Sequence, residues 1–135
     1  MLQHAGIEIA PAEVDRALLL FELLGFERVE PPPSLADGFT WVERKGTQIH
    51  LMHEDSPTVP PRGHVAVVVP DFDAALARLH DRGFDPEPHR EHWSSPRAVV
   101  TLPGGHRIEM MAFPPSQGRI LPPPGTRSVP PNPCR

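Results

Sequence analysis

The chain is short of the residues that mark several common classes of protein. It has one cysteine in 135 residues, Cys134, which excludes an intramolecular disulfide and argues against a thiolate metal site. Thirteen basic residues against seventeen acidic ones give a net charge of −4, which provides no basic field for nucleic acid. No stretch approaches the roughly 20 apolar residues of a membrane span, and the first residues lack the basic start and apolar run of a signal peptide. We therefore expect one cytoplasmic domain, with neither nucleic acid nor membrane as partner.

Proline is abundant instead, with twenty residues, and its positions divide the chain. A cluster from Pro57 to Pro61 predicts a linker at about 56–62, which separates a first module of about 2–55 from a second of about 63–113. Residues 114–135 carry eight prolines and almost no apolar periodicity. This segment is predicted to be a disordered tail or a polyproline-like arm laid across a partner subunit.

Two segments of the chain resemble each other at their beginnings and ends. The first opens with Gln-His-Ala-Gly-Ile at 3–7 and closes with Gly-Thr-Gln-Ile-His at 46–50, and the second opens with Gly-His-Val-Ala-Val at 63–67 and closes with Gly-His-Arg-Ile-Glu at 105–109. His4 therefore corresponds to His64, and His50 to Glu109.

Each segment predicts the order βαβββ. Alternating residues indicate strands, apolar residues at helical spacing indicate one helix in each segment, and Gly25 and Gly83 follow the helices as stop signals. We expect strands at 4–9, 26–30, 39–44, 47–52, 64–69, 84–89, 97–102 and 106–113, and helices at 13–24 and from the N-cap Asp71 to about 79. The fold class is α+β, with the two modules pairing their sheets around one cleft.

Strand phase places the four repeated polar residues on one face. Ile7, Ile49, Val67 and Ile108 take the helix-covered face, so His4, His50, His64 and Glu109 are predicted on the opposite, concave face. Imidazoles with one carboxylate suit a divalent ion such as zinc, nickel, iron or manganese. The alternative for any one of these histidines is a strand residue hydrogen-bonded in a cleft.

Other side chains have weaker signals. Residues three apart on a strand point to opposite faces, so His53 is not expected to share a metal with His50. His53, His80, His89, His92 and His106 are interpreted as solvated. Trp41 and Trp93 are candidates for walls of a substrate pocket or for ordinary packing. Arg107, on the same face as Glu109, could pair with a carboxylate or phosphonate of the substrate or with an acid such as Glu8.

With these motifs the chain resembles the vicinal oxygen chelate superfamily, the group of glyoxalases, bleomycin-resistance proteins and extradiol dioxygenases. The resemblance covers residues 2–113 and rests on His4, Gln-Ile-His-Leu at 48–51, Gly-His-Val-Ala at 63–66 and Arg-Ile-Glu-Met at 107–110. It implies paired βαβββ modules in a cupped mixed sheet around one divalent metal ion, with His4, His50, His64 and Glu109 as ligands. It also implies a small-molecule substrate and a homodimer. Each site then lies either within one chain or between two, where His4 and His50 of one chain meet His64 and Glu109 of the other.

The implied function is Lewis acid catalysis on a small oxygen-chelating metabolite by a lyase, isomerase or dioxygenase, with Glu109 also able to carry a proton. His50 stands where glyoxalase I usually has a glutamate, which counts against that particular activity. Leu102-Pro103-Gly104-Gly105 replaces the Asp-Pro-Asp-Gly turn of many members. Two alternatives remain: a metal-free protein that sequesters an antibiotic, as in bleomycin resistance, and a fosfomycin-modifying transferase, for which His4, His64 and Glu109 would suffice.

Overall fold

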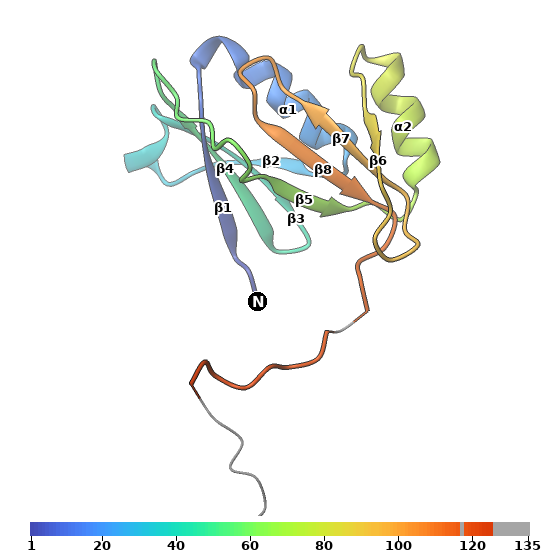
Figure 1. Ribbon diagram of the computed structural model, residues 1–135. Helices are drawn as coiled ribbons and strands as arrows, with labels where there is room; N and C mark the ends of the chain where they lie inside the picture. Colours follow the sequence, from blue (N-terminus) through green and yellow to red (C-terminus); the bar gives the residue numbers. More distant parts are fainter. Residues whose placement is uncertain (117, 126–135) are drawn as a thin grey trace, which may run out of the picture.

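The computed structural model describes residues 1–116 and 118–125. Its elements follow the predicted order in both modules: β1 (His4–Ile9), η1 (Pro11–Glu13), α1 (Val14–Leu23), β2 (Glu27–Val29), η2 (Pro33–Leu35), β3 (Phe39–Arg44), β4 (Thr47–His53), β5 (Val65–Val68), α2 (Phe72–Asp81), β6 (Glu87–His89), β7 (Arg97–Thr101) and β8 (Arg107–Met111). The predicted arm falls partly outside these residues, as does Cys134. Its described part contains no helix or strand and leaves the domain after β8 (Figure 1).

The strands form two four-stranded mixed sheets of the same design. The orders are β1-β4-β3-β2 and β5-β8-β7-β6, and in each sheet the first strand of the module runs parallel to the last one. The two sheets lie beside each other with α1 and α2 on one side (Figure 1). The α+β class and the two βαβββ modules are therefore confirmed, with one separate sheet for each module.

The helices end where the sequence predicts, and for the expected reason. Gly25 and Gly83 have φ values of +91° and +78°, a conformation that side chains with a Cβ rarely adopt. Both helices bury an apolar stripe, which includes Ala17 and Phe21 on α1 and Ala75 and Leu79 on α2. Asp71 occupies the predicted N-cap position, but its carboxylate makes an ion pair with Arg78 at 2.9 Å and no capping hydrogen bond.

The two modules share one hydrophobic core and are joined by polar contacts at its margin. Arg16 of α1 donates a hydrogen bond to the carbonyl of Arg82 and places its guanidinium 3.6 Å from the centre of the Phe84 ring. Arg78 of α2 donates to the carbonyl of Leu23 in return. These contacts fix the second module relative to the helix of the first.

Two histidines interpreted as solvated are not. His106 is only 6% exposed and hydrogen-bonds through Nε2 to the carbonyl of Glu8, so it connects the β7–β8 turn to β1. His53 is half-buried, with Nε2 2.9 Å from Oγ1 of Thr40. Spacing along the strand predicts only that His53 does not share a metal with His50. The turn between β7 and β8 carries His106 to β1 of the other module, which spacing could not indicate. His80, His89 and His92 are exposed, as expected.

Candidate metal site

His64 and Glu109 lie side by side on the second sheet. His64 directly precedes β5, which pairs in parallel with β8, where Glu109 lies. The Nε2 atom of His64 is 2.9 Å from Oε2 of Glu109, while Oε1 of the same carboxylate accepts a hydrogen bond of 2.6 Å from Nε of Arg97. Glu109 is 5% exposed, so this carboxylate is bound from both sides inside the protein.

The backbone determines which nitrogen of His64 carries a hydrogen. Nδ1 lies 2.8 Å from the carbonyl oxygen of Arg62, which can only accept, so Nδ1 is the donor. A neutral His64 therefore presents the lone pair of Nε2 to a carboxylate oxygen, and these two acceptors repel each other. The contact therefore requires a cation, either a proton on Nε2 or a metal ion bound by both atoms. Histidines that bind a metal usually donate from their other ring nitrogen to a carbonyl or carboxylate, as Nδ1 of His64 does here.

The charge of Glu109 is fixed by its neighbours. Burial alone would raise its pKa, but hydrogen bonds from Arg97 and His64, together with their positive charge, hold the pKa below its usual value. The group is therefore an ionised carboxylate near neutral pH, the form that binds a metal and accepts a proton.

His50 of the first sheet lies in a stack of three aromatic rings. Its ring centre is 3.8 Å from that of Trp41 and 4.1 Å from that of His4, with interplanar angles of 3° and 12°. Trp41 is its direct neighbour on β3, and His4 reaches it from β1. Burial, and after it the proximity of His4, lowers the pKa of His50, so this imidazole stays neutral.

A chain of side-chain amides sets the hydrogens of both stacked histidines. Glu43 accepts from Nε2 of Gln48 at 2.9 Å, which leaves Oε1 of Gln48 to accept from Gln3 and from Nε2 of His50. Oε1 of Gln3 then accepts from Nδ1 of His4. Because a carboxylate can only accept, the whole series has one direction, and it leaves lone pairs on Nε2 of His4 and Nδ1 of His50.

The stacked rings limit how these two histidines can act together. A metal ion lies in the plane of an imidazole that binds it, and two nearly parallel planes about 4 Å apart have no common point nearby. One ring must turn before both can bind one ion. His4 is exposed, whereas His50 is 9% exposed between two rings and is bonded to Gln48.

The four predicted ligands are thus brought together as two pairs, one on each sheet. His4 lies against His50, and His64 lies against Glu109. Within the part of the chain that the structure describes, no three His, Cys, Asp or Glu side chains are close enough to hold one ion.

The remaining predicted residues lie near these pairs. Trp41 stacks on His50, and its buried Nε1 has no hydrogen-bond partner among the described residues. Trp93 donates to the carbonyl of Phe113 at 2.9 Å, at the start of the arm. Arg107 shares the face of Glu109, as expected, but it donates to the carbonyl of Pro61 rather than to Glu8, which binds the backbone of Thr58.

Arg97 was missed by sequence reasoning, although the sequence contains a signal for it. Ala98 and Val100 are apolar and alternate with Arg97, which places Arg97 on the face opposite the core. Val99 is paired with Glu109 in the sheet, and Arg97 is two residues away on the same face. Only the strand register, which the sequence does not contain, reveals this contact.

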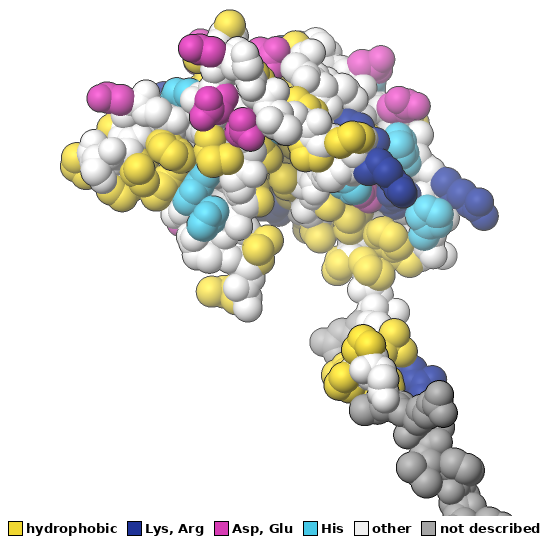
Figure 2. All heavy atoms as spheres, turned by 60° about the vertical axis from the view of Figure 1, so that its left-hand side comes forward, with side chains coloured by type: hydrophobic (Ala, Val, Ile, Leu, Met, Phe, Trp, Pro, Cys, Tyr) yellow, Lys and Arg dark blue, Asp and Glu magenta, His cyan; other side chains and the backbone are white. Residues whose placement is uncertain are grey.

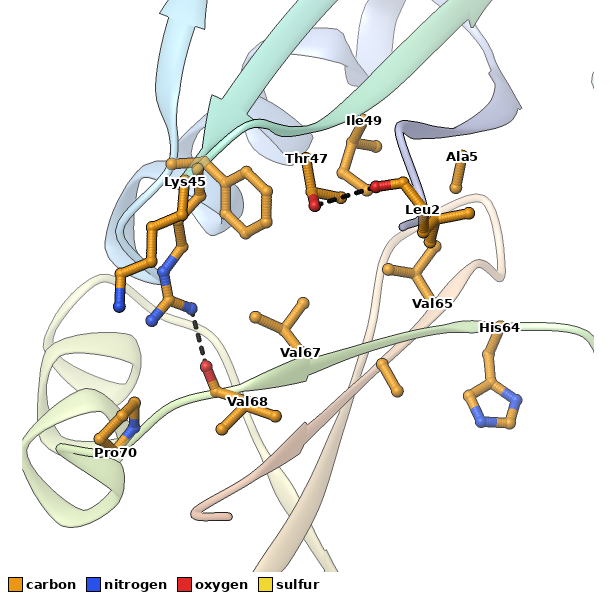
Figure 3. Close-up of a pocket in the computed structure, with 13 residues that line it drawn as sticks. Leu2, Ala5, Lys45, Thr47, Ile49, His64, Val65, Val67, Val68 and Pro70 are labelled. Atoms are coloured by element: carbon orange, nitrogen blue, oxygen red, sulfur yellow. Dashed lines mark hydrogen bonds between the residues drawn. The ribbon is translucent and has the colours of Figure 1, made fainter. Parts of the chain in front are cut away.

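An apolar pocket of about 430 Å³ opens between the two modules, and His64 is among the residues that line it. Figure 3 shows Leu2, Ala5 and Ile49 of the first module facing Val65 and Val67 of the second. Arg44 and Lys45 lie at one end of this pocket, where Arg44 donates to the carbonyl of Val68 at 2.7 Å. Its size is that of a small-molecule site.

The family assignment follows from this arrangement and from a direct match. The family model of the glyoxalase, bleomycin resistance protein and dioxygenase superfamily matches residues 5–110. The chain belongs to this superfamily. Its members often use a divalent metal, bind small molecules and form dimers.

Solved structures agree on the fold. A putative glyoxalase family protein from Bacillus anthracis has a TM-score of 0.72 at 24% identity, over 82% of this chain and 93% of that one. A superfamily member from Sphaerobacter thermophilus has a TM-score of 0.60 at 24% identity, over 82% and 95%. A protein described as oxidase ChaP-H1 has a TM-score of 0.66 at 22% identity, over 84% and 96%. Among curated proteins none matches. None of the helices in the described ranges is long and apolar enough to span a membrane.

Proposed function

We propose that this protein is a metal-dependent enzyme of the superfamily, and that a second copy of the chain completes its site. His64 and Glu109 of one chain, with His4 of the other, supply two imidazoles and one carboxylate, a set that suits iron, manganese, nickel or zinc. His50 is the fourth candidate. The reaction would be that of a lyase, isomerase or dioxygenase on a small oxygen-chelating substrate.

The observation that carries this proposal is the 2.9 Å contact between Nε2 of His64 and Oε2 of Glu109, two atoms that can hold a cation together. The carbonyl of Arg62 keeps the hydrogen of His64 on Nδ1, so the facing nitrogen is ready to bind a cation. The lowered pKa of Glu109 keeps its negative charge available. The nitrogen of His64 and the carboxylate of Glu109 therefore support the binding of a positive ion at this point.

The second copy is supported by the separation of the two pairs. Each pair contributes fewer donors than the three or four that a transition metal takes from protein, and each lies on its own sheet. Joining the first sheet of one chain to the second sheet of another would bring the two pairs to one ion and give a symmetric dimer with two sites. The parallel rings of His4 and His50 favour His4 as the ligand from the first sheet, with its ring supported by His50, which is itself stacked on Trp41.

Each residue has a distinct task in the proposed reaction. A bound divalent ion would supply Lewis acid polarisation of a substrate oxygen. Glu109 is the ionised carboxylate that can take a proton from the substrate, and Arg97 holds it in place through Oε1. Trp41 and Trp93 would provide apolar walls for the substrate.

Metal analysis of protein purified without an affinity tag tests the site. The wild type is expected to retain about one ion per chain, and a His64→Ala, Glu109→Ala double variant to lose it. His80→Ala, which removes an exposed histidine of α2, is the matched control and should keep the ion. Because removing Glu109 deprives Arg97 of its partner, Glu109→Gln is measured beside it, with circular dichroism to verify folding. Equal metal content in wild type and folded Glu109→Gln would refute the site.

A metal-free binding protein is the second candidate, and the Arg97–Glu109 pair favours it. With a proton on His64, the carboxylate is satisfied by two cationic side chains and needs no metal. The apolar pocket between the modules would then be available to an antibiotic-like molecule. A fosfomycin-modifying transferase would use the same three ligands as the enzyme, His4, His64 and Glu109. Absence of metal in the wild type would favour the binding protein, whereas activity with fosfomycin and a thiol would identify the transferase.

A further inference from the structure

The second sheet carries a surplus of positive charge next to the His64–Glu109 pair. A cavity of about 80 Å³ is lined by His64, His89, Arg97, Val99, Arg107 and Glu109. Two guanidinium groups face one carboxylate here, so the lining is cationic even with both histidines neutral. Figure 2 shows arginine and histidine side chains gathered close to the start of the C-terminal arm.

Arg97 has hydrogen-bonding capacity that its protein partners do not use. Its Nε donates to Glu109 and its Nη1 to the carbonyl of Arg90, and Nη2 has no partner in the described part of the chain. The side chain is only 13% exposed. An arginine held so firmly, with donors left over beside a cavity, suits the two oxygens of an acid group better than it suits solvent.

Arg107 provides the second cation from the neighbouring strand. Its Nη2 donates to the carbonyl of Pro61 at 2.9 Å, which fixes one end of the guanidinium to the linker and leaves Nε and Nη1 for another acceptor. Arg107 and Glu109 are two residues apart on β8, so both project to the face on which Arg97 lies. The two arginines are therefore held by backbone carbonyls around one small space.

The size of the cavity limits what it can hold. A water molecule takes about 30 Å³ of liquid, so about 80 Å³ accommodates a single acid group and not a whole metabolite. The rest of such a molecule would extend past His64 and Glu109.

We propose that this cavity is an anion subsite, in which Arg97 and Arg107 bind the carboxylate or phosphonate of the substrate. That this anion belongs to the substrate rests on the proposed function, while the binding of the anion itself does not. The inferred substrate is a small chelating compound with an acid group a few bonds from the oxygen that would bind the metal ion at His64 and Glu109.

The test uses the full chain stripped of metal with EDTA and titrated with acetate, methylphosphonate and the neutral acetamide, followed by NMR. Both anions should bind saturably and acetamide should not, and whichever anion binds more tightly identifies the acid group. Arg107→Gln should weaken binding by about tenfold to a hundredfold, the loss expected for a charged hydrogen bond. Arg97→Lys keeps the positive charge but loses the paired donors of the guanidinium, and it should weaken anion binding as well.

Arg28→Gln is the matched control, since it removes the same charge from an exposed position on β2 of the other module. Its binding should equal that of the wild type. Saturable binding of acetamide, no binding of either anion, or equal weakening in Arg28→Gln and Arg107→Gln would overturn the subsite. Because no metal is present in this titration, failure of the anion subsite would leave the metal proposal standing. Anion binding by a protein that retains no metal in the metal analysis would refute the metal site and leave the anion subsite standing.

Discussion

His50 is a buried histidine held neutral by its surroundings. Trp41 and His4 cover its two ring faces, and Gln48 fixes its Nε2 hydrogen. Charging this ring would require desolvation of an imidazolium beside another histidine, which is why its pKa is lowered. The sequence predicts this residue as a ligand from its type and its strand phase. Its ring stacking, which decides how readily it can bind, depends on two neighbouring strands.

The lowered pKa of His50 has a consequence for stability. The unfolded chain takes up a proton near the ordinary value of 6.5, whereas the folded protein resists it, so stability is full above this pH and falls as the pH decreases below it. We expect a lower denaturation midpoint at about pH 5.5 than at about pH 7.5, and a smaller difference in His50→Asn. Urea melts of both proteins at the two pH values measure this. Glu109, whose pKa is lowered from 4.5, responds only in more acidic solution. An equal pH difference in both proteins would contradict the assignment.

His106 gives a second prediction, concerning the junction of the modules. His106→Ala removes the hydrogen bond to the carbonyl of Glu8 and should lower the free energy of unfolding by about 1–3 kcal/mol. His89→Ala, at an exposed position on β6, should change it by less than about 0.5 kcal/mol. Urea denaturation of the two variants compares them, and equal effects would show that the junction contributes nothing particular.

At the scale of elements, the sequence was sufficient for the order of strands and helices. Three signals determine it: alternation along the strands, apolar residues at helical spacing, and Gly25 and Gly83 after the helices. One strand end differs from the prediction, since β6 begins at Glu87 and not at Phe84. The amide of Phe84 donates to the carbonyl of Leu79 and so still belongs to the end of α2. The contact between Arg97 and Glu109 could not be predicted, because alternation gives the face of a residue but not its neighbour on the next strand.

The positive φ of Gly83 predicts a local cost of substitution. Gly83→Ala places a Cβ where φ is +78°, and we expect a loss of about 1 kcal/mol of stability. Gly38→Ala is the control, because a Cβ there meets nothing within 4 Å and φ is not positive. Thermal melts of both variants measure the difference. A loss as large in Gly38→Ala would indicate that strain at the helix end is not its cause.

At the scale of the whole molecule, the two modules share one hydrophobic core, while their candidate ligands remain in two separate pairs. The sequence predicted the four ligands as one set, and it left open whether one chain or two would assemble them. The structure brings together His4 with His50, and His64 with Glu109. Assembly of the site by two chains is compatible with both the shared core and the two separate pairs of ligands, because it needs no movement of the core.

Mixing two inactive variants tests assembly directly. In a symmetric dimer, His4→Ala damages one half of a site and Glu109→Gln the other, so a mixed dimer keeps one intact site. After unfolding and refolding an equal mixture, about a quarter of the wild-type metal content should return, whereas each variant alone retains little. Light scattering should give about twice the chain mass of 14.9 kDa. No recovery on mixing, or a monomer by light scattering, would place the site within one chain.

Glu43 lies in no candidate site, yet it controls the state of His4 from three side chains away. Gln48 and Gln3 can each be turned by 180° at little cost, so two hydrogen arrangements of the series would be equally good if its end were neutral. Glu43→Gln removes the carboxylate that selects one of these two arrangements. His4 would then exchange between its two tautomers, one of which has no lone pair on Nε2. Nitrogen-15 NMR of the imidazoles distinguishes them. The carboxylate thus protects the binding form of a histidine that it never touches.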